Sequence, residues 1–238
     1  MKIGEILTGN KKYTVTKKVT PGDRPNANIY LCADSNGQEY IAKHFYKQRP
    51  MPNVAYGKKN HYGRRRDGSR SIFAEIQAKS NTYDFLINHL DRFKHNGKWV
   101  IILQYIKGYT FDDFIKRNKS DLLIVKSAVV ELAKTLVIWH NNEFAHGDPH
   151  LDNCMIQQTD SGDLKVWLID YCQLHHKDFR YCQKYECFRS NKERRIKEDL
   201  INNTGHFGKG FRTGLVELEN ELGFGNVLSE LFDMHYIR

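Results

Sequence analysis

Two short stretches, each bordered by apolar residues, constrain the possible fold more than any other part of this chain. The first, Phe144–Ile156, follows a long apolar helical pattern and carries Asp148 and Asn153 five positions apart. The second, Val166–Cys172, is an apolar run that reaches Asp170, and a Thr-Asp-Ser-Gly-Asp turn separates it from the first. Apolar runs on both sides of such a turn are typical of a hairpin. The pattern predicts helix, loop and hairpin, with the second strand returning Asp170 to the side of Asn153.

The residue types in these stretches indicate phosphate chemistry. Two carboxylates and one amide oxygen would meet, and hard oxygen ligands of this kind suit Mg²⁺ that is also bound to phosphate. With Asn153 and Asp170 on the metal, Asp148 remains to orient an attacking hydroxyl group. Positioned metal ligands and an orienting carboxylate are what phosphoryl transfer requires.

The same residues resemble a known pair of motifs. His146-Gly-Asp148-Pro-His-Leu-Asp-Asn153, followed by Asp170-Tyr-Cys, resembles the catalytic loop and metal-binding turn of the protein-kinase-like superfamily. The Gly-Asp-Pro-His form is closer to small bacterial kinases, including lipopolysaccharide core heptose kinases and aminoglycoside-phosphotransferase-like enzymes. The resemblance implies Mg²⁺ and ATP as cofactors, Asp148 as a catalytic residue, and Asn153 and Asp170 as metal ligands. Asp and Asn also occur in ordinary turns and helix caps.

The N-terminal part alternates apolar and polar residues, which predicts strands over 13–19, 27–33 and 39–45. Lys43, in Ile-Ala-Lys, resembles the kinase lysine that grips the α- and β-phosphates and is implied to be catalytic. Glu75, on a predicted helix over 71–79, would be its partner. The alternative is an exposed lysine whose head reaches solvent.

The connection Thr20–Asn26 falls where kinases carry a glycine-rich phosphate loop. Gly22 would match the first glycine, but Arg24 and Ala27 stand where the other two are expected. Glycines allow the backbone to approach phosphate closely. Two interpretations stay open: a phosphate loop into which Arg24 reaches, or a plain turn.

A predicted helix over 81–93 and an Asn-Gly turn lead into a buried strand, Trp99–Leu103. The next segment, 104–108, resembles the kinase hinge. The resemblance implies that backbone groups of Gln104 and Ile106 bind the adenine edge of ATP, with Leu103 at the gatekeeper position.

Helical patterns dominate the remainder. Thr110 begins one helix, and the segment from Asp121 to about Asn142 is the strongest helix of the chain. After Asp170 no Ala-Pro-Glu closes an activation segment, and helices are expected over 191–203 and 215–222. The predicted fold class is α+β: a bilobal protein-kinase-like fold with a small antiparallel β N-lobe and a reduced, mainly helical C-lobe. The chain would form a single domain over 1–238, with the N-lobe at about 1–103, the hinge at 104–108 and the C-lobe at 109–238.

The net charge of the chain indicates which kinds of partner it favours. The formal charge is +9, from 37 Lys and Arg against 28 Asp and Glu, which favours anionic ligands. The basic segment 56–70 is predicted either to be solvated or to bind an anionic acceptor. We expect a monomer that uses ATP and a hydroxyl-bearing acceptor, either a protein or a phosphorylated glycan. Nucleic acid is not an expected partner, and peripheral membrane contact stays open.

Five cysteines in a chain without the apolar core of a cleaved signal indicate reduced thiols. No run approaches the roughly 18 apolar residues of a membrane span. We expect a cytoplasmic location, with the inner membrane face or export without a cleaved signal as alternatives. Cys172, His175, His176, Cys182 and Cys187 lie within sixteen positions, but their spacing matches no zinc knuckle, so no zinc is expected.

The acceptor is not determined by these features. The strand Ile29–Ala33 and its hairpin resemble protein kinases, which narrowly favours a protein Ser/Thr kinase. The missing activation segment and the Gly-Asp-Pro-His loop favour a lipopolysaccharide core heptose kinase as the alternative. A pseudokinase that acts as a binding module is the third hypothesis.

Overall fold

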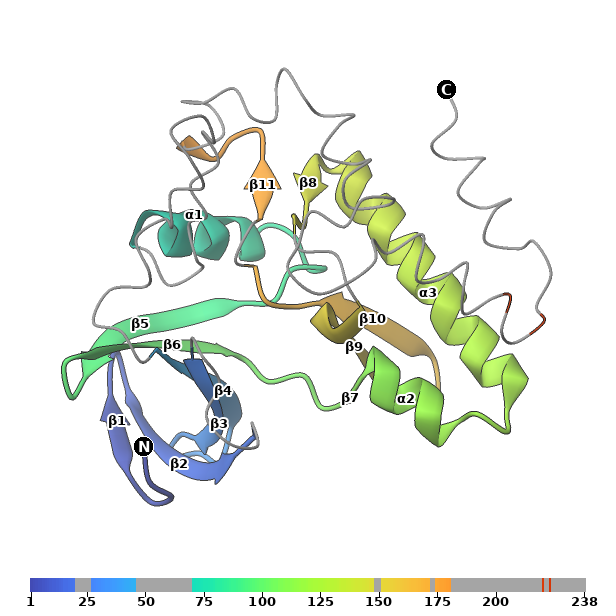
Figure 1. The fold of residues 1–238 in the computed structure, drawn as a ribbon. Coiled ribbons are helices and arrows are strands. Elements are labelled where there is room, and N and C mark those ends of the chain that lie inside the picture. Colours follow the sequence, from blue (N-terminus) through green and yellow to red (C-terminus); the bar gives the residue numbers. More distant parts are fainter. Residues whose placement is uncertain are drawn as a thin grey trace, which may run out of the picture. The chain divides into compact units, whose positions relative to one another are not determined.

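Strands with alternating apolar residues form a six-stranded antiparallel sheet in the first half of the chain (Figure 1). The strands are β1 (Ile6–Thr8), β2 (Lys12–Lys18), β3 (Ala27–Ala33), β4 (Glu39–Phe45), β5 (His89–His95) and β6 (Lys98–Gln104). Their order in the sheet is β1-β2-β3-β4-β6-β5. Helix α1 (Arg70–Ser80) packs beside β5.

The computed structural model describes residues 1–19, 27–45, 70–147, 151–171 and 174–180, together with Asn220 and Gly223. The chain divides into two units, Met1–Ile106 and Lys107–Arg238. The division falls inside the predicted hinge segment 104–108. The helices predicted over 191–203 and 215–222 lie outside the described residues.

The pleat of the sheet separates two environments in the first unit. Tyr40 and Ala42 of β4 point into the curled interior, where they join a core of residues from β1, β2, β3 and β6. The intervening residues of β4 lie on the opposite face, because successive side chains of a strand alternate. There Phe45 packs with Phe73 of α1 and with Ile101 of β6. Lys43 therefore lies on the face that α1 covers.

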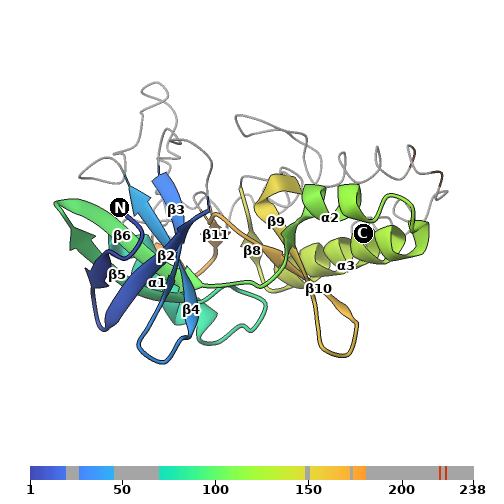
Figure 2. The same cartoon turned by 90° about the horizontal axis from the view of Figure 1, so that it is seen from below.

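The two outermost strands of the sheet come close to each other, so the sheet is nearly closed into a barrel (Figures 1 and 2). The buried carboxylate of Asp91 in β5 accepts a hydrogen bond from the backbone N–H of Asn10, which follows β1, at 2.6 Å. The hydroxyl of Tyr13 lies 3.4 Å from the same oxygen. Gly9 permits this approach, since a Cβ there would lie 2.1 Å from the Asp91 carboxylate.

The second unit combines short strands with two described helices. Its elements are β7 (Tyr109–Thr110), α2 (Phe111–Arg117), α3 (Leu122–Asn141), β8 (Phe144–Ala145), the 3₁₀ helix η1 (Leu151–Asn153), β9 (Cys154–Gln158), β10 (Leu164–Leu168) and β11 (His175–His176). Strands β10, β9 and β7 form one sheet, and β11 pairs with β8. The side chains of Thr110 and Asp121 accept N-terminal N–H groups and begin α2 and α3, as the sequence predicts. Within the described ranges no helix is long and apolar enough to cross a membrane.

The predicted fold class, a bilobal protein-kinase-like fold with a small β N-lobe and a mainly helical C-lobe, is wrong. The described residues form an antiparallel, nearly closed, barrel-like sheet of six strands, and they contain three α-helices. Three short strand pairings, in two small sheets, accompany α2 and α3 in the second unit, where the sequence predicted mainly helix. Local periodicity does not reveal closure, because closure depends on contacts between residues far apart in the chain.

One helix boundary is also wrong. The helix predicted over 81–93 is absent, since α1 ends at Ser80 and β5 begins at His89. Asn96 and Gly97 have positive φ of 50° and 74°, which is the geometry of a tight hairpin, and β5 pairs with β6 across this turn. The Asn-Gly turn therefore connects two strands, β5 before it and β6 after it, and not a helix and a strand.

We expect Asp91→Ala to lower the free energy of unfolding by about 2–3 kcal/mol. The substitution leaves a backbone N–H group and a tyrosine hydroxyl without their charged acceptor. Gly9→Ala should destabilise through the clash with the same carboxylate. Chemical denaturation measures both effects, with exposed Asp84→Ala as the control. Equal stability of the Asp91→Ala and Asp84→Ala proteins would contradict closure by Asp91.

His44 makes the first unit sensitive to acid. Burial in the barrel interior lowers the pKa of His44 from 6.5 to about 4, and the positive charges of the N-terminal amine and of Lys98 add to the effect, whereas Glu5 opposes it. A lowered folded-state pKa favours the neutral ring, so stability present above pH 6.5 is lost as the pH falls toward 4. The expected loss is on the order of 3 kcal/mol. Denaturation at several pH values should show this slope in the parent and a shallower one in His44→Leu; identical slopes would refute it.

Candidate functional site

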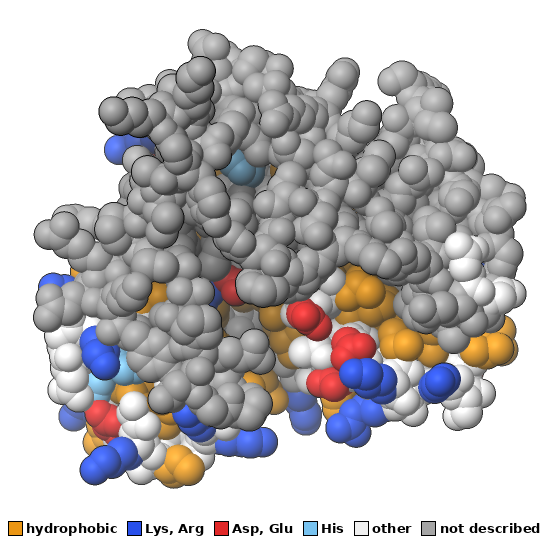
Figure 3. Space-filling view, viewed as in Figure 1, with side chains coloured by type: hydrophobic (Ala, Val, Ile, Leu, Met, Phe, Trp, Pro, Cys, Tyr) orange, Lys and Arg blue, Asp and Glu red, His pale blue; other side chains and the backbone are white. Residues whose placement is uncertain are grey.

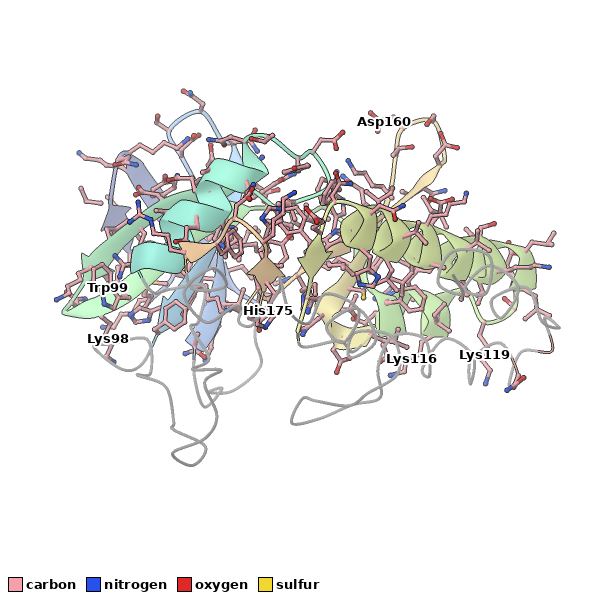
Figure 4. The ribbon with its side chains drawn as sticks, turned by 90° about the horizontal axis from the view of Figure 1, so that it is seen from above. Lys98, Trp99, Lys116, Lys119, Asp160 and His175 are labelled. Carbon is pink, nitrogen blue, oxygen red and sulfur yellow. The ribbon has the colours of Figure 1, made fainter. Side chains whose placement is uncertain are left out.

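The β9–β10 hairpin brings the two predicted metal ligands together. Its register pairs Leu164 with Gln158 at the turn and Leu168 with Cys154 at the opposite end. Asp160 marks the outer tip of the turn (Figure 4). The backbone N–H of Ile169 continues the ladder and donates to the carbonyl oxygen of Asn153 at 2.8 Å. The backbone of Asn153 is therefore bonded to the residue that directly precedes Asp170.

These two side chains supply the oxygen donors that Mg²⁺ prefers. Asn153 is buried at the end of η1, whereas Asp170 is exposed. Mg²⁺ keeps several waters and needs only one or two protein oxygens when phosphate completes its coordination. The pair therefore fits the ion in residue type. Three or more His, Cys, Asp or Glu side chains do not gather into a metal site anywhere in the described part of the chain.

Asp170 has a left-handed backbone, with φ of 61°. Few residues other than glycine adopt this region, although Asp tolerates it better than most. The carbonyl oxygen of the preceding Ile169 lies 2.7 Å from Nε2 of His146. A carbonyl only accepts, so Nε2 carries the proton and donates. His146 is fully buried, and this bond fixes the peptide that leads into Asp170.

The sequence pattern assigns no separate role to His146. In the structure it is fully buried and its hydrogen bond to Ile169 holds the backbone that leads into Asp170. In the sequence, His146 is recognisable only by its place two positions before Asp148. Its hydrogen bond to Ile169 becomes known only from the tertiary structure.

Lys43 lies in the middle of β4, paired with Ile29 of β3 and Ile101 of β6. Its side chain is buried, and Nζ is 5.7 Å from the centre of the Phe45 ring. Glu75 is half-buried on α1, the helix that packs on this same face of the sheet. The alternative, an exposed lysine, is therefore excluded for Lys43.

The end of β6 carries the predicted adenine contacts. The backbone N–H of Gln104 donates to the carbonyl oxygen of Asn88 at 2.9 Å, and its side-chain oxygen accepts from Asn88 N–H at 3.3 Å. The backbone N–H of Gln104 is therefore already bonded inside the unit. Ile106 has a buried side chain, and Leu103 lies on the same sheet face as Lys43.

Gly108 allows the segment after Ile106 to approach β9. A Cβ at Gly108 would lie 2.1 Å from the carbonyl oxygen of Ile156, so no other residue fits without a shift of the backbone. Strand β7 then pairs Tyr109 with Ile156. The absence of a side chain at Gly108 therefore lets the start of the second unit pack against β9, the strand that follows Asn153.

Charged side chains near η1 are largely compensated. Helix α2 contacts η1, and its Asp112 accepts a hydrogen bond from Lys116 at 2.5 Å. This bond, with the charges of Asp113 and Asp152, raises the pKa of Lys116. Figure 3 shows acidic and basic side chains next to one another over α2. A paired surface of this kind is typical of solvated helix faces and is worth little in stability.

Several predicted residues lie outside the described residues. Asp148, the predicted catalytic carboxylate, and Gly22, in the predicted phosphate loop, are among them, as is the basic segment apart from its last residue. Cys172, Cys182 and Cys187 also lie outside. The described cysteines, Cys32 and Cys154, are buried thiols that form no disulfide with each other, and burial raises the pKa of both, to about 12 for Cys32.

No protein-family model matches the chain, and a comparison with curated proteins gave no match either.

Proposed function

We propose that the protein is an ATP-dependent phosphotransferase that moves the γ-phosphoryl group of Mg·ATP to a hydroxyl acceptor. One observation carries it: the backbone hydrogen bond at the end of the hairpin that joins Asn153 to Ile169, the residue before Asp170. Two hard oxygen donors at one hairpin end, one of them on a left-handed backbone, support a site for magnesium and phosphate.

Each residue has a distinct role in this proposal. Asn153 and Asp170 hold Mg²⁺, and Lys43 binds phosphate oxygens with Glu75 as its partner. Asp148 orients the acceptor hydroxyl and takes its proton late in the reaction. Bound Mg²⁺ would neutralise the charge that develops on the phosphate oxygens. Catalysis would come from positioning and charge neutralisation, in keeping with a loose transition state.

The burial of Lys43 supports its part. Lys43 lies on the sheet face that α1 covers, and a phosphate oxygen would be attracted to its positive charge there. Gln104 and Ile106 are proposed to contact the adenine through backbone groups, and Gly22 is proposed to lie near the phosphates.

A protein Ser/Thr acceptor is narrowly favoured, on the strand and hairpin pattern over 27–45. The second candidate is a lipopolysaccharide core heptose, favoured by the Gly-Asp-Pro-His loop and the missing Ala-Pro-Glu. The formal charge of +9 fits an anionic acceptor in both cases. We further propose that the protein acts as a cytoplasmic monomer.

Lys43→Met should weaken ATP binding by about tenfold or more, because a charge-assisted hydrogen bond is lost. The methionine retains the apolar stem, so the β4 pairings should survive and the melting temperature should change little. Calorimetric ATP titration measures the effect, and exposed Lys12→Met on β2 is the matched control. Equal ATP affinity in the parent and the Lys43→Met protein would remove Lys43 from the site.

Asp170→Asn and Asp148→Asn should fail in different ways. Asn tolerates a left-handed backbone, so Asp170→Asn removes only the charge, and both Mg²⁺-dependent ATP binding and turnover should drop. Asp148→Asn should retain Mg·ATP binding and lose about 10²–10⁴-fold in kcat, the usual contribution of general-base help. Nucleotide binding with and without Mg²⁺, and turnover with protein and glycan acceptors, measure the difference.

Asp160→Asn at the far tip of the hairpin is the control and should match the parent. If both substitutions abolish ATP binding equally, Asp148 does not face the acceptor. A parent that binds Mg·ATP without turnover would identify a pseudokinase instead.

A further inference from the structure

Trp139 packs against three aromatic rings from segments on either side of the β9–β10 hairpin. It lies near the end of α3 and is fully buried. Its ring centre lies 5.8 Å from that of Phe144 in β8, 5.9 Å from that of His146, and 5.5 Å from that of Tyr171. One indole therefore joins α3 to the residues before the predicted catalytic loop and to the residue after Asp170.

The backbone of Asp170 is held on both sides. On one side, Ile169 donates its N–H to Asn153 at 2.8 Å and accepts from His146 at 2.7 Å. On the other side, the Tyr171 ring is 1 % exposed and packs edge-on against Trp139. Asp170 between them is exposed.

A left-handed backbone at an aspartate costs free energy, so it is kept only where contacts of the surrounding residues fix it. Two of the groups that determine it here, His146 and Tyr171, contact the same indole and also approach each other, at 6.1 Å between ring centres. Loss of the indole would leave room for both rings to move. The peptide on each side of Asp170 would then relax together.

We propose that Trp139 is a positioning residue that sets the Mg²⁺ affinity of the site by holding Asp170 in its left-handed conformation. The inference rests on the proposed function, since it assigns Trp139 to the metal site proposed there. Trp139 touches neither metal nor substrate and acts through His146 and Tyr171. A residue that only fills the core would change stability without changing the Mg²⁺ dependence of ATP binding.

The test compares Trp139→Leu and Trp139→Phe with Leu132→Ala in the full chain. Leu132 is equally buried on α3, seven residues earlier. ATP binding is titrated against Mg²⁺ for each protein, below its unfolding temperature. Trp139→Leu should raise the Mg²⁺ concentration at half-saturation by about tenfold, in line with the cost of such a backbone conformation. Trp139→Phe, which keeps a ring, should lie between it and the parent, and Leu132→Ala should match the parent.

Hydrogen exchange at the Ile169 amide gives a readout that needs no nucleotide. This amide donates to Asn153, so it should exchange faster in Trp139→Leu than in Leu132→Ala. Adding Asp170→Gly to Trp139→Leu should restore part of the protection, because glycine adopts the left-handed region without strain.

Equal Mg²⁺ midpoints and equal Ile169 exchange in the Trp139→Leu and Leu132→Ala proteins would overturn the inference. A parent that binds ATP without any Mg²⁺ dependence would instead defeat the proposed function. In that case the role of Trp139 in holding Asp170 is still decided by the exchange measurement alone, with faster exchange in Trp139→Leu supporting it and unchanged exchange refuting it.

Discussion

The hydrogen bond between the Asp91 carboxylate and the Asn10 backbone links the two outermost strands of the sheet, and the first unit depends on it. Side chains on the concave face of a curled sheet are shielded from water when its two edge strands approach each other. Here that interior contains the rings of Tyr13, Tyr30 and Tyr40. A buried carboxylate is costly unless hydrogen-bond donors surround it. Asp91 is bonded by the backbone N–H of Asn10, and the absence of a side chain at Gly9 lets the backbone come close enough.

Closure also decides which side chains of β4 can meet a ligand. With Tyr40, Ala42 and His44 turned into the barrel, the alternate residues must lie on the other face. Lys43 is among them, in the layer that α1 covers. The same pleat thus makes His44 a neutral, buried ring and Lys43 a candidate for phosphate contact, although the two residues are neighbours in the chain.

In the second unit, unusual backbone conformations border the stretch that contains the candidate ligands. Glu143 and Asp170 both have positive φ, 62° and 61°, although neither is glycine. Glu143 follows α3 and forms an ion pair with Lys177, next to β11. Strand β11 pairs with β8, and His176 packs against Phe144 with ring centres 4.2 Å apart. The start of the loop and the segment after Asp170 are therefore tied together, which keeps the end of the β9–β10 hairpin in one register.

The sequence by itself determined the local elements and the residue types at the candidate site. Periodicity and turn residues identified β2, β3, β4, α1, α3 and the β9–β10 hairpin, because those signals come from residues close together in the chain. The same spacing predicted Asp170 beside Asn153. Only the tertiary structure decided the closure of the sheet, the strand β5 in place of a helix, and the contacts of His146 and Trp139. These depend on pairings such as Asn10 with Asp91, whose partners are 81 residues apart, and no local pattern encodes which distant partner a buried group will find.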